Sequence, residues 1–301
     1  MEKTSFDIHQ HITDKIIDAI ETGRAKGNDF QMPWHSVGVS FPVNRVTGKA
    51  YNGINIIMLW IMAQEKGYGS GQWATFKQWQ QLGYSVRKGE KGSRIVYYNE
   101  LEKENEDGNI EKIPFAKGSV VFAAEQIEGY ELPKVSNGTE SFKRVQNAED
   151  VIRNTQAKIR FEGQSAYYRP STDEIVIPPA ETFRPTATGD TQGNYYSTVF
   201  HELSHWTAAK GRCDRDLSGR FKTQSYAMEE LVAELSAAFL CAHCGVEAEP
   251  RLDHAQYIDG WLTVLKNDKK AIFSAASAAS KATQYIMLFT LLQDLNNHKA
   301  A

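Results

Sequence analysis

The chain has 301 residues, 41% of them hydrophobic and 24% charged, which is the composition of a folded protein long enough for two domains with separate cores. The net charge of −3 predicts no partner by itself, and it argues against a protein that mimics DNA, because such a protein carries a far larger acidic excess. Three cysteines, no signal-peptide pattern in the first residues and no apolar run of membrane-spanning length lead us to expect a protein of the reducing cytoplasm without a membrane partner.

The first 130 residues combine helical and strand patterns. Apolar residues recur at helical spacing before Gly23, whereas short β-branched and aromatic runs flank a stretch rich in acidic residues. In chain order, we predict a helix over 7–23, a turn-rich segment over 42–55, helices over 56–66 and 73–82, a basic glycine turn over 86–94, a strand at 95–98, an exposed hairpin tip or insertion over 99–111, and a strand at 119–123.

Positive charge is concentrated between Arg45 and Arg94, where eight basic residues are accompanied by only two acidic ones. Aromatic residues interleave with them, as in grooves that bind single-stranded nucleic acid, where cations follow the phosphates and exposed rings stack on bases. The other interpretation places the rings in the core and the cations on a solvated face, and composition alone leaves both open for Trp73, Phe76 and Trp79. The candidate DNA-binding residues are Lys49, Tyr51, Trp73, Phe76, Lys77, Trp79, Arg87, Lys88, Lys91 and Arg94.

Three long motifs follow one another in this region. They are Pro42-x-Asn44 with Thr47-Gly48-Lys49-x-Tyr51-x-Gly53-x-Asn55, then Trp73-x-Thr75-Phe76-Lys77-Gln78, then Gly83-x-x-Val86-Arg87-Lys88-Gly89-Glu90-Lys91-Gly92. With these motifs, the segment from Ile12 to Tyr98 resembles the N-terminal domain of ArdC-type antirestriction proteins, a domain shared with plasmid TraC-type primases. The resemblance implies that this domain binds single-stranded DNA and that the protein has a role in plasmid conjugation between bacteria.

Apolar periodicity is lost over 133–148, and this loss predicts a linker between two domains. We place an N-terminal domain at 1–135, the linker at 136–147 and a C-terminal domain at 148–301. The C-terminal domain is predicted to begin with a helix over 148–160 and a hairpin made from 160–162, 166–170 and 173–178. A strand of this hairpin is the candidate to pair with an extended substrate.

The segment His201-Glu202-Leu203-Ser204-His205 is the H-E-x-x-H signature of zinc metallopeptidases. Two histidines four residues apart lie on one helix face, so both can bind one Zn²⁺ ion, and Glu202 is left to take a proton from a metal-bound water. The alternative is an amphipathic helix that carries two histidines by chance. We favour the metal site, because residues 195–211 have the spacing of a buried helix.

A catalytic zinc needs a third protein ligand. Ala208 and Gly211 exclude the metzincin continuation, which needs glycine and histidine at these positions. A predicted helix over 226–240 can supply a glutamate instead, as in gluzincins. We favour Glu230 as the ligand and Glu234 as the carboxylate that orients a histidine, with Glu229 as the alternative ligand. The other interpretation makes these glutamates solvated surface.

The C-terminal half also resembles the zincin-like domain that accompanies ArdC-type N-terminal domains, through His201-Glu202-x-x-His205-Trp206 and Glu229-Glu230-Leu231-x-Ala233-Glu234. We therefore expect an α+β protein with a single-stranded-DNA-binding domain and a gluzincin-like metallopeptidase domain that holds Zn²⁺, or another divalent metal such as Mn²⁺. The resemblance implies antirestriction, the protection of incoming plasmid DNA from host restriction enzymes. A protein linked to host restriction is the candidate substrate, and the sequence does not identify it. The alternative is a non-enzymatic DNA-binding protein whose metal is structural.

Overall fold

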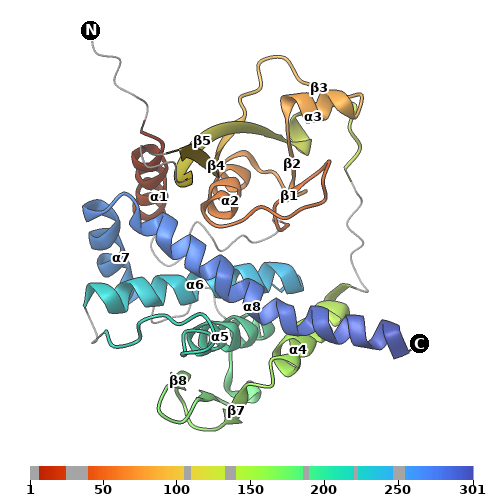
Figure 1. Cartoon of the computed structure of the whole chain (residues 1–301). Helices are drawn as coiled ribbons and strands as arrows, with labels where there is room; N and C mark the ends of the chain where they lie inside the picture. The colour runs from red at the N-terminus through yellow and green to blue at the C-terminus, as the bar shows by residue number, and fades with distance from the viewer. Residues whose placement is uncertain are drawn as a thin grey trace.

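The computed structural model describes residues 7–24, 40–104, 110–132, 140–185, 190–219, 223–246 and 255–300. Helices and sheets occur in both halves of the chain, so the predicted α+β class is confirmed (Figure 1). In these ranges, no helix has the length and apolar character needed to cross a membrane.

The N-terminal half is built on a mixed sheet. Its elements are α1 (Ile8–Arg24), β1 (Val43–Asn44), α2 (Ile54–Lys66), β2 (Gln72–Thr75), α3 (Phe76–Gln81), β3 (Ser85–Val86), β4 (Ser93–Glu104), β5 (Ile110–Ala123), the 3₁₀ turn η2 (Ala124–Gln126) and β6 (Ile127–Glu128). Four strands pair in the order β1-β2-β5-β4, with β1 parallel to β2 and the other pairs antiparallel. The long β4–β5 hairpin brings Ser93 opposite Val121 and Glu104 opposite Ile110.

Helix α2 is attached to the sheet by Asn55. Its side-chain Nδ2 donates to the Val96 carbonyl at 2.8 Å, and its Oδ1 accepts from the Val96 amide at 2.8 Å. The amide of Asn55 therefore pairs with β4 as a neighbouring strand would. The helix ends at Gly67, whose φ of +69° is a conformation that glycine adopts without strain.

The predicted helix over 73–82 is wrong in its first three residues. Residues 72–75 form β2, and Trp73 pairs with Ala123 of β5. The helix α3 begins only after Thr75, whose side chain accepts a hydrogen bond from the Gln78 amide in a capping box. The strand is stabilised by a partner that lies about fifty residues later in the chain, so local spacing could not predict it.

The C-terminal half consists of a small sheet and a group of helices. Its elements are α4 (Glu140–Asn154), β7 (Lys158–Phe161), β8 (Tyr167–Arg169), β9 (Glu174–Ile177), the 3₁₀ turn η3 (Ala180–Thr182), α5 (Thr191–Trp206), α6 (Gln224–Cys244), α7 (Ala255–Asn267) and α8 (Ala271–Ala300). The strand order is β7-β9-β8, so β8 is an edge strand. Helix α6 packs against α5, α7 and α8 and is buried along most of its length.

Two predicted helix boundaries and one predicted strand pairing in this half differ from the structure. Helix α4 begins at Glu140, inside the predicted linker, and ends at Asn154. Strand β7 runs parallel to β9, so only β8 and β9 form an antiparallel pair. Helix α5 ends at Trp206, before the predicted stop at Gly211, because the chain then turns back on itself.

One hydrophobic core joins the two halves. Helix α1 contacts α7, and α2 contacts α8. The ring of Trp60, which is 1% exposed, lies 5.7 Å from that of Phe239 on α6. Hydrogen bonds also cross between the halves, from Thr13 Oγ1 to the Lys269 carbonyl and from the Gly53 amide to Ser280 Oγ, each at 2.8 Å. The metal-motif helices therefore pack into the same core as α1 and α2.

Candidate metal centre

Helix α5 carries both histidines of the H-E-x-x-H motif toward α6. Asp190 caps the amino end of the helix, where its carboxylate accepts a hydrogen bond from the Gly193 amide at 2.6 Å. His201 and Glu202 are each 3% exposed, and His205 is partly buried. The four-residue spacing places the two imidazole rings 4.8 Å apart, centre to centre, on one side of the helix.

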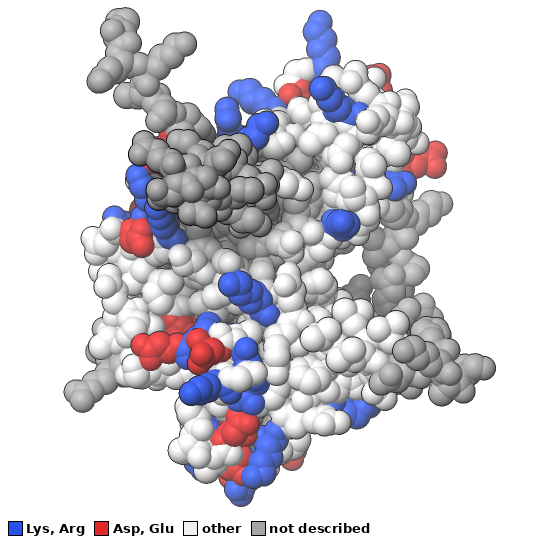
Figure 2. Space-filling view, viewed as in Figure 1, with Lys and Arg blue, Asp and Glu red and all other residues white. Residues whose placement is uncertain are grey.

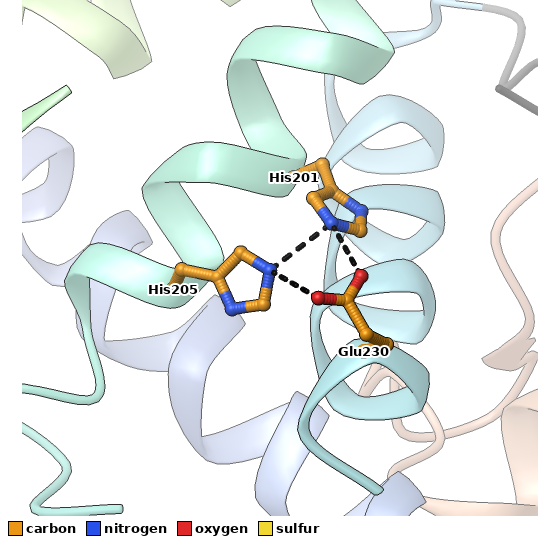
Figure 3. A group of neighbouring side chains, drawn as sticks. All are labelled: His201, His205 and Glu230. Carbon is orange, nitrogen blue, oxygen red and sulfur yellow. Dashed lines mark hydrogen bonds and ion pairs between the residues drawn. The ribbon is translucent and has the colours of Figure 1, made fainter. Parts of the chain in front are cut away.

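Glu230 on α6 completes a group of three potential metal ligands (Figure 3). His201 Nε2 lies 3.1 Å from His205 Nε2, and the two carboxylate oxygens of Glu230 lie 3.4 Å from His201 Nε2 and 3.6 Å from His205 Nε2. Ligand atoms around a tetrahedral zinc ion are separated by about 3.3 Å, since each bond is about 2.0–2.1 Å long. The nitrogen and oxygen donors therefore fit a divalent metal such as zinc in both chemistry and spacing.

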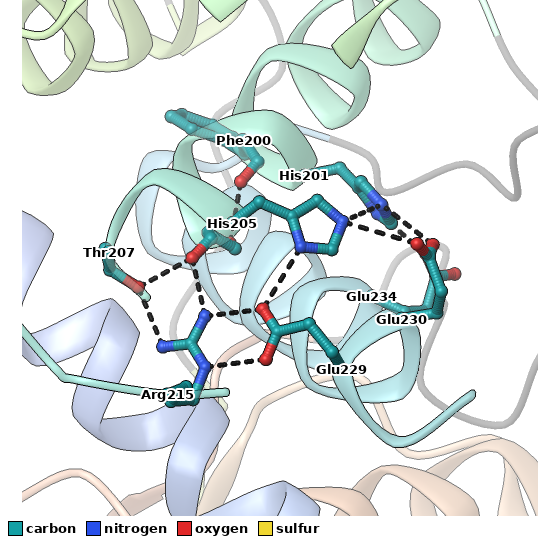
Figure 4. Close-up of polar contacts among 9 residues, drawn as sticks. Phe200, His201, His205, Thr207, Arg215, Glu229, Glu230 and Glu234 are labelled. Carbon is teal, nitrogen blue, oxygen red and sulfur yellow. Dashed lines mark hydrogen bonds and ion pairs between the residues drawn. The ribbon is translucent and has the colours of Figure 1, made fainter. Parts of the chain in front are cut away.

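Glu229, the alternative ligand, points to a different set of partners (Figure 4). One of its oxygens lies 3.1 Å from His205 Nδ1, the ring nitrogen that does not face the group. Both of its oxygens accept from the Arg215 guanidinium, at 2.8 and 2.9 Å. Glu234 similarly lies 3.6 Å from His201 Nδ1, on the side where a carboxylate can orient that ring.

The two neighbouring glutamates are both held in the ionised form. Burial raises the pKa of the Glu230 carboxyl, but the hydrogen bond from His201 and the charges of the two histidines outweigh it and lower this pKa to about 2. Burial also raises the pKa of Glu229, and the hydrogen bonds from Arg215 and His205 hold it below its ordinary value. Two carboxylates are thus available to accept hydrogen bonds or a metal.

A cavity of about 340 Å³ opens beside this group. Edge strand β8 lines one side of it with Tyr167 and Tyr168, Tyr226 of α6 lines another, and Glu202 reaches it together with both histidines. The outer edge of β8 is not paired with another described strand. The cavity therefore combines the three donors, a further carboxylate and a strand edge that can accept an extended peptide.

The candidate DNA-binding residues divide into buried and exposed groups. Trp73 and Trp79 are 2% and 0% exposed, so in this structure both rings are packed in the core and neither presents a face on which a base could stack. Tyr51 is partly buried, and its hydroxyl accepts from Asn44 Nδ2 at 3.3 Å. Phe76 is 47% exposed. The remaining candidates are all exposed: Lys49, Lys77, Arg87, Lys88, Lys91 and Arg94.

Two residues of interest were missed by the sequence analysis. Tyr97 of β4 is 64% exposed and pairs with Lys117 across the hairpin. The sequence predicted a strand over 95–98, but so short a segment does not show which of its two faces is exposed to solvent. Arg215 contacts the metal group through Glu229. It stands in a loop without a motif, so no local pattern distinguished it from a surface arginine.

Comparison with known proteins relates each half to a family. Residues 6–122 match the N-terminal domain of the anti-restriction factor ArdC, and residues 146–278 match a zincin-like metallopeptidase domain. The protein y4eC of Sinorhizobium fredii is 40% identical over 294 residues, covering 94% of this chain and 92% of the relative. A DNA primase TraC of Escherichia coli is 35% identical over 310 residues, but these span only 28% of that much longer protein.

Solved structures of an antirestriction protein share the whole fold. The metal-free crystal structure of ArdC from plasmid R388 aligns with a TM-score of 0.77 and 38% identity, covering 94% of this chain and 98% of that chain. The Mn(II)-bound structure of the same protein aligns with a TM-score of 0.74 at the same identity and coverage. The chain belongs to the ArdC family of antirestriction proteins.

Proposed function

We propose that the C-terminal half, predicted as residues 148–301, is a zinc-dependent metallopeptidase. His201, His205 and Glu230 would be the protein ligands, with Mn²⁺ as the alternative metal. The observation that carries this proposal is the convergence of three donor atoms within 4.8 Å of one another at the wall of a cavity. An open cavity beside the ligands is the mark of a catalytic site, whereas structural zinc sites are closed by a fourth protein ligand.

In this mechanism, Glu202 is the general base. A divalent metal bound here would lower the pKa of a water ligand and polarise a peptide carbonyl. The Glu202 carboxylate, which lines the same cavity, takes the proton of the attacking water on one of its oxygens and later delivers it to the departing amine. Glu234 orients His201, and the edge of β8 holds the extended substrate by main-chain hydrogen bonds.

For the N-terminal half, predicted as residues 1–135, we propose binding of single-stranded DNA on an exposed face of the sheet. The sheet patch consists of Phe76, Arg94, Val120 and Phe122. The rings of Phe76 and Phe122 lie 6.2 Å apart, and Val120, 40% exposed, pairs with Arg94. Figure 2 shows mostly Lys and Arg among the coloured side chains over the upper part of the molecule, where this sheet and α3 lie. Such a surface can hold phosphates and stack bases without reading sequence.

Together these activities would protect incoming conjugative DNA from restriction in the bacterial cytoplasm. The sheet patch would bring the protein to the entering single strand, and the metal site would act on a host protein linked to restriction. Family membership supports the antirestriction role, and the cavity supports the enzymatic version of it.

Glu202→Gln tests the enzymatic proposal, with Glu128→Gln, at an exposed glutamate of β6, as the matched control. We expect Glu202→Gln to keep metal and oligonucleotide affinity while hydrolysis of an unfolded protein mixture falls by about three or more powers of ten, since the base is removed and the shape kept. Plasmid transfer into a restricting host should then be as poor as with a deletion. Full protection by Glu202→Gln would instead support the non-enzymatic alternative, in which DNA binding protects and the metal is structural.

A further inference from the structure

The side chain of Arg215 lies at the junction of the two ligand-bearing helices (Figure 4). Its Nε and Nη2 donate to the two oxygens of Glu229 on α6. On the α5 side, Nη1 donates to Thr207 Oγ1 at 2.9 Å and Nη2 to the Ser204 carbonyl at 2.7 Å. One guanidinium therefore ties the carboxyl end of the His205 helix to the helix that carries Glu230.

The backbone is shaped to deliver this side chain. After α5 the chain reverses, and the Cys213 amide donates to the Thr207 carbonyl at 2.8 Å. Asp214 has a φ of +49°, a conformation that is unusual for a residue with a side chain. The Arg215 amide then donates to the Ala208 carbonyl at 2.9 Å. The side chain is 12% exposed, so its charge is held against the helices and away from solvent.

The contact continues from Arg215 to the metal group. Because both Glu229 oxygens accept from the guanidinium, Glu229 is a carboxylate, and His205 Nδ1 must donate in the 3.1 Å contact between them. In the neutral ring, which is the form that binds a metal, a proton on Nδ1 leaves the lone pair on Nε2, the nitrogen that faces His201 and Glu230. Carboxylates behind metal-binding histidines fix the ring and its tautomer in this way.

We propose that Arg215 is a positioning residue that sets the metal affinity of the His201–His205–Glu230 group. It acts by holding Glu229 against His205 and by fixing α5 relative to α6. This inference rests on the proposed metal site and does not depend on peptide hydrolysis.

The test measures Zn²⁺ affinity of the full chain by chelator competition and records the visible spectrum with Co²⁺. Arg215→Ala should weaken Zn²⁺ binding about 10- to 100-fold and change the Co²⁺ spectrum, because orienting partners of ligand histidines contribute that much. Arg215→Lys, which keeps the charge without the two-pronged contact, should fall between Arg215→Ala and the unaltered chain. In the Glu229→Gln background, Arg215→Ala should weaken binding much less than it does alone.

Arg212→Ala is the control for a purely structural role. Arg212 is also mostly buried, 14% exposed, and pairs with Asp173 and the Trp206 ring, without a contact to Glu229 in the described chain. It should lower the melting temperature of the metal-free protein and leave Zn²⁺ affinity within about threefold of the unaltered value. If Arg215→Ala and Arg215→Lys also leave Zn²⁺ affinity within that range, the inference is overturned. A chain whose Zn²⁺ affinity depends on Arg215 but which cleaves no peptide would overturn the peptidase proposal alone.

Discussion

Glu229 and Glu230 are adjacent on α6, yet their carboxylates have different partners. Glu230 faces the Nε2 atoms of both histidines, and Glu229 faces Arg215 and His205 Nδ1. The histidines could be predicted from sequence, because their spacing within one helix fixes their relation. The choice between the two glutamates could not be made with the same certainty, since it depends on the rotation of α6 relative to α5, which long-range packing determines.

This difference predicts unequal effects of two matched substitutions. Glu230→Gln replaces a charged metal ligand by a neutral amide and should weaken Zn²⁺ binding by more than about 100-fold. Glu229→Gln removes the ion pair with Arg215 but keeps an acceptor for His205, so the loss should be about 10-fold. Chelator competition measures both. The reverse order of the two losses would make Glu229 the ligand.

At the scale of elements, β2 and α3 decide which aromatic rings are available to DNA. Trp73 lies within β2 and Trp79 on the inner side of α3, where its Nε1 donates to the Phe122 carbonyl at 3.0 Å. Phe76, the first residue of α3, is exposed. The sequence shows that aromatic and basic residues interleave here. Whether each ring faces the core or the solvent depends on strand pairing with β5, which is distant in sequence.

Substitution of these rings should separate stability from DNA binding. Trp79→Ala creates a cavity in the core and should lower the free energy of unfolding by about 3–5 kcal/mol. Phe76→Ala should lower it by less than about 1 kcal/mol and weaken binding of a labelled thymine oligonucleotide by about fivefold or more, since stacking contributes about 1–3 kcal/mol per base. Denaturant unfolding and fluorescence anisotropy measure the two quantities. Unchanged oligonucleotide affinity in Phe76→Ala would remove this ring from the proposed interface.

At the scale of the whole molecule, the first family match ends before the predicted linker and the second begins at residue 146, near the end of that linker, but the core runs between the two halves. Helices α1 and α2 pack on α7 and α8, and Trp60 packs on Phe239. The domain limits that we predicted from the loss of apolar periodicity over 133–148 remain a prediction. Contacts between halves are long-range, and nothing in the local pattern of α1 distinguishes packing on the sheet from packing on α7.

The continuous core predicts that the full chain unfolds in one transition. Zn²⁺ at about 100 times its dissociation constant adds about 2.7 kcal/mol to the stability of the folded state. The whole transition should therefore move up by several degrees. Differential scanning calorimetry with and without Zn²⁺ measures this shift. Two separate peaks, of which only one responds to the metal, would show that the halves unfold independently.

The central claim is an open metal site formed by His201, His205 and Glu230. Crystals of the full chain grown with Zn²⁺ and measured at the zinc absorption edge test it most directly. We expect one anomalous peak about 2.0–2.2 Å from His201 Nε2, His205 Nε2 and a Glu230 oxygen, with the fourth position open to the cavity beside Glu202. A peak bound by Glu229, a fourth protein ligand that closes the site, or no peak between α5 and α6 would contradict the account.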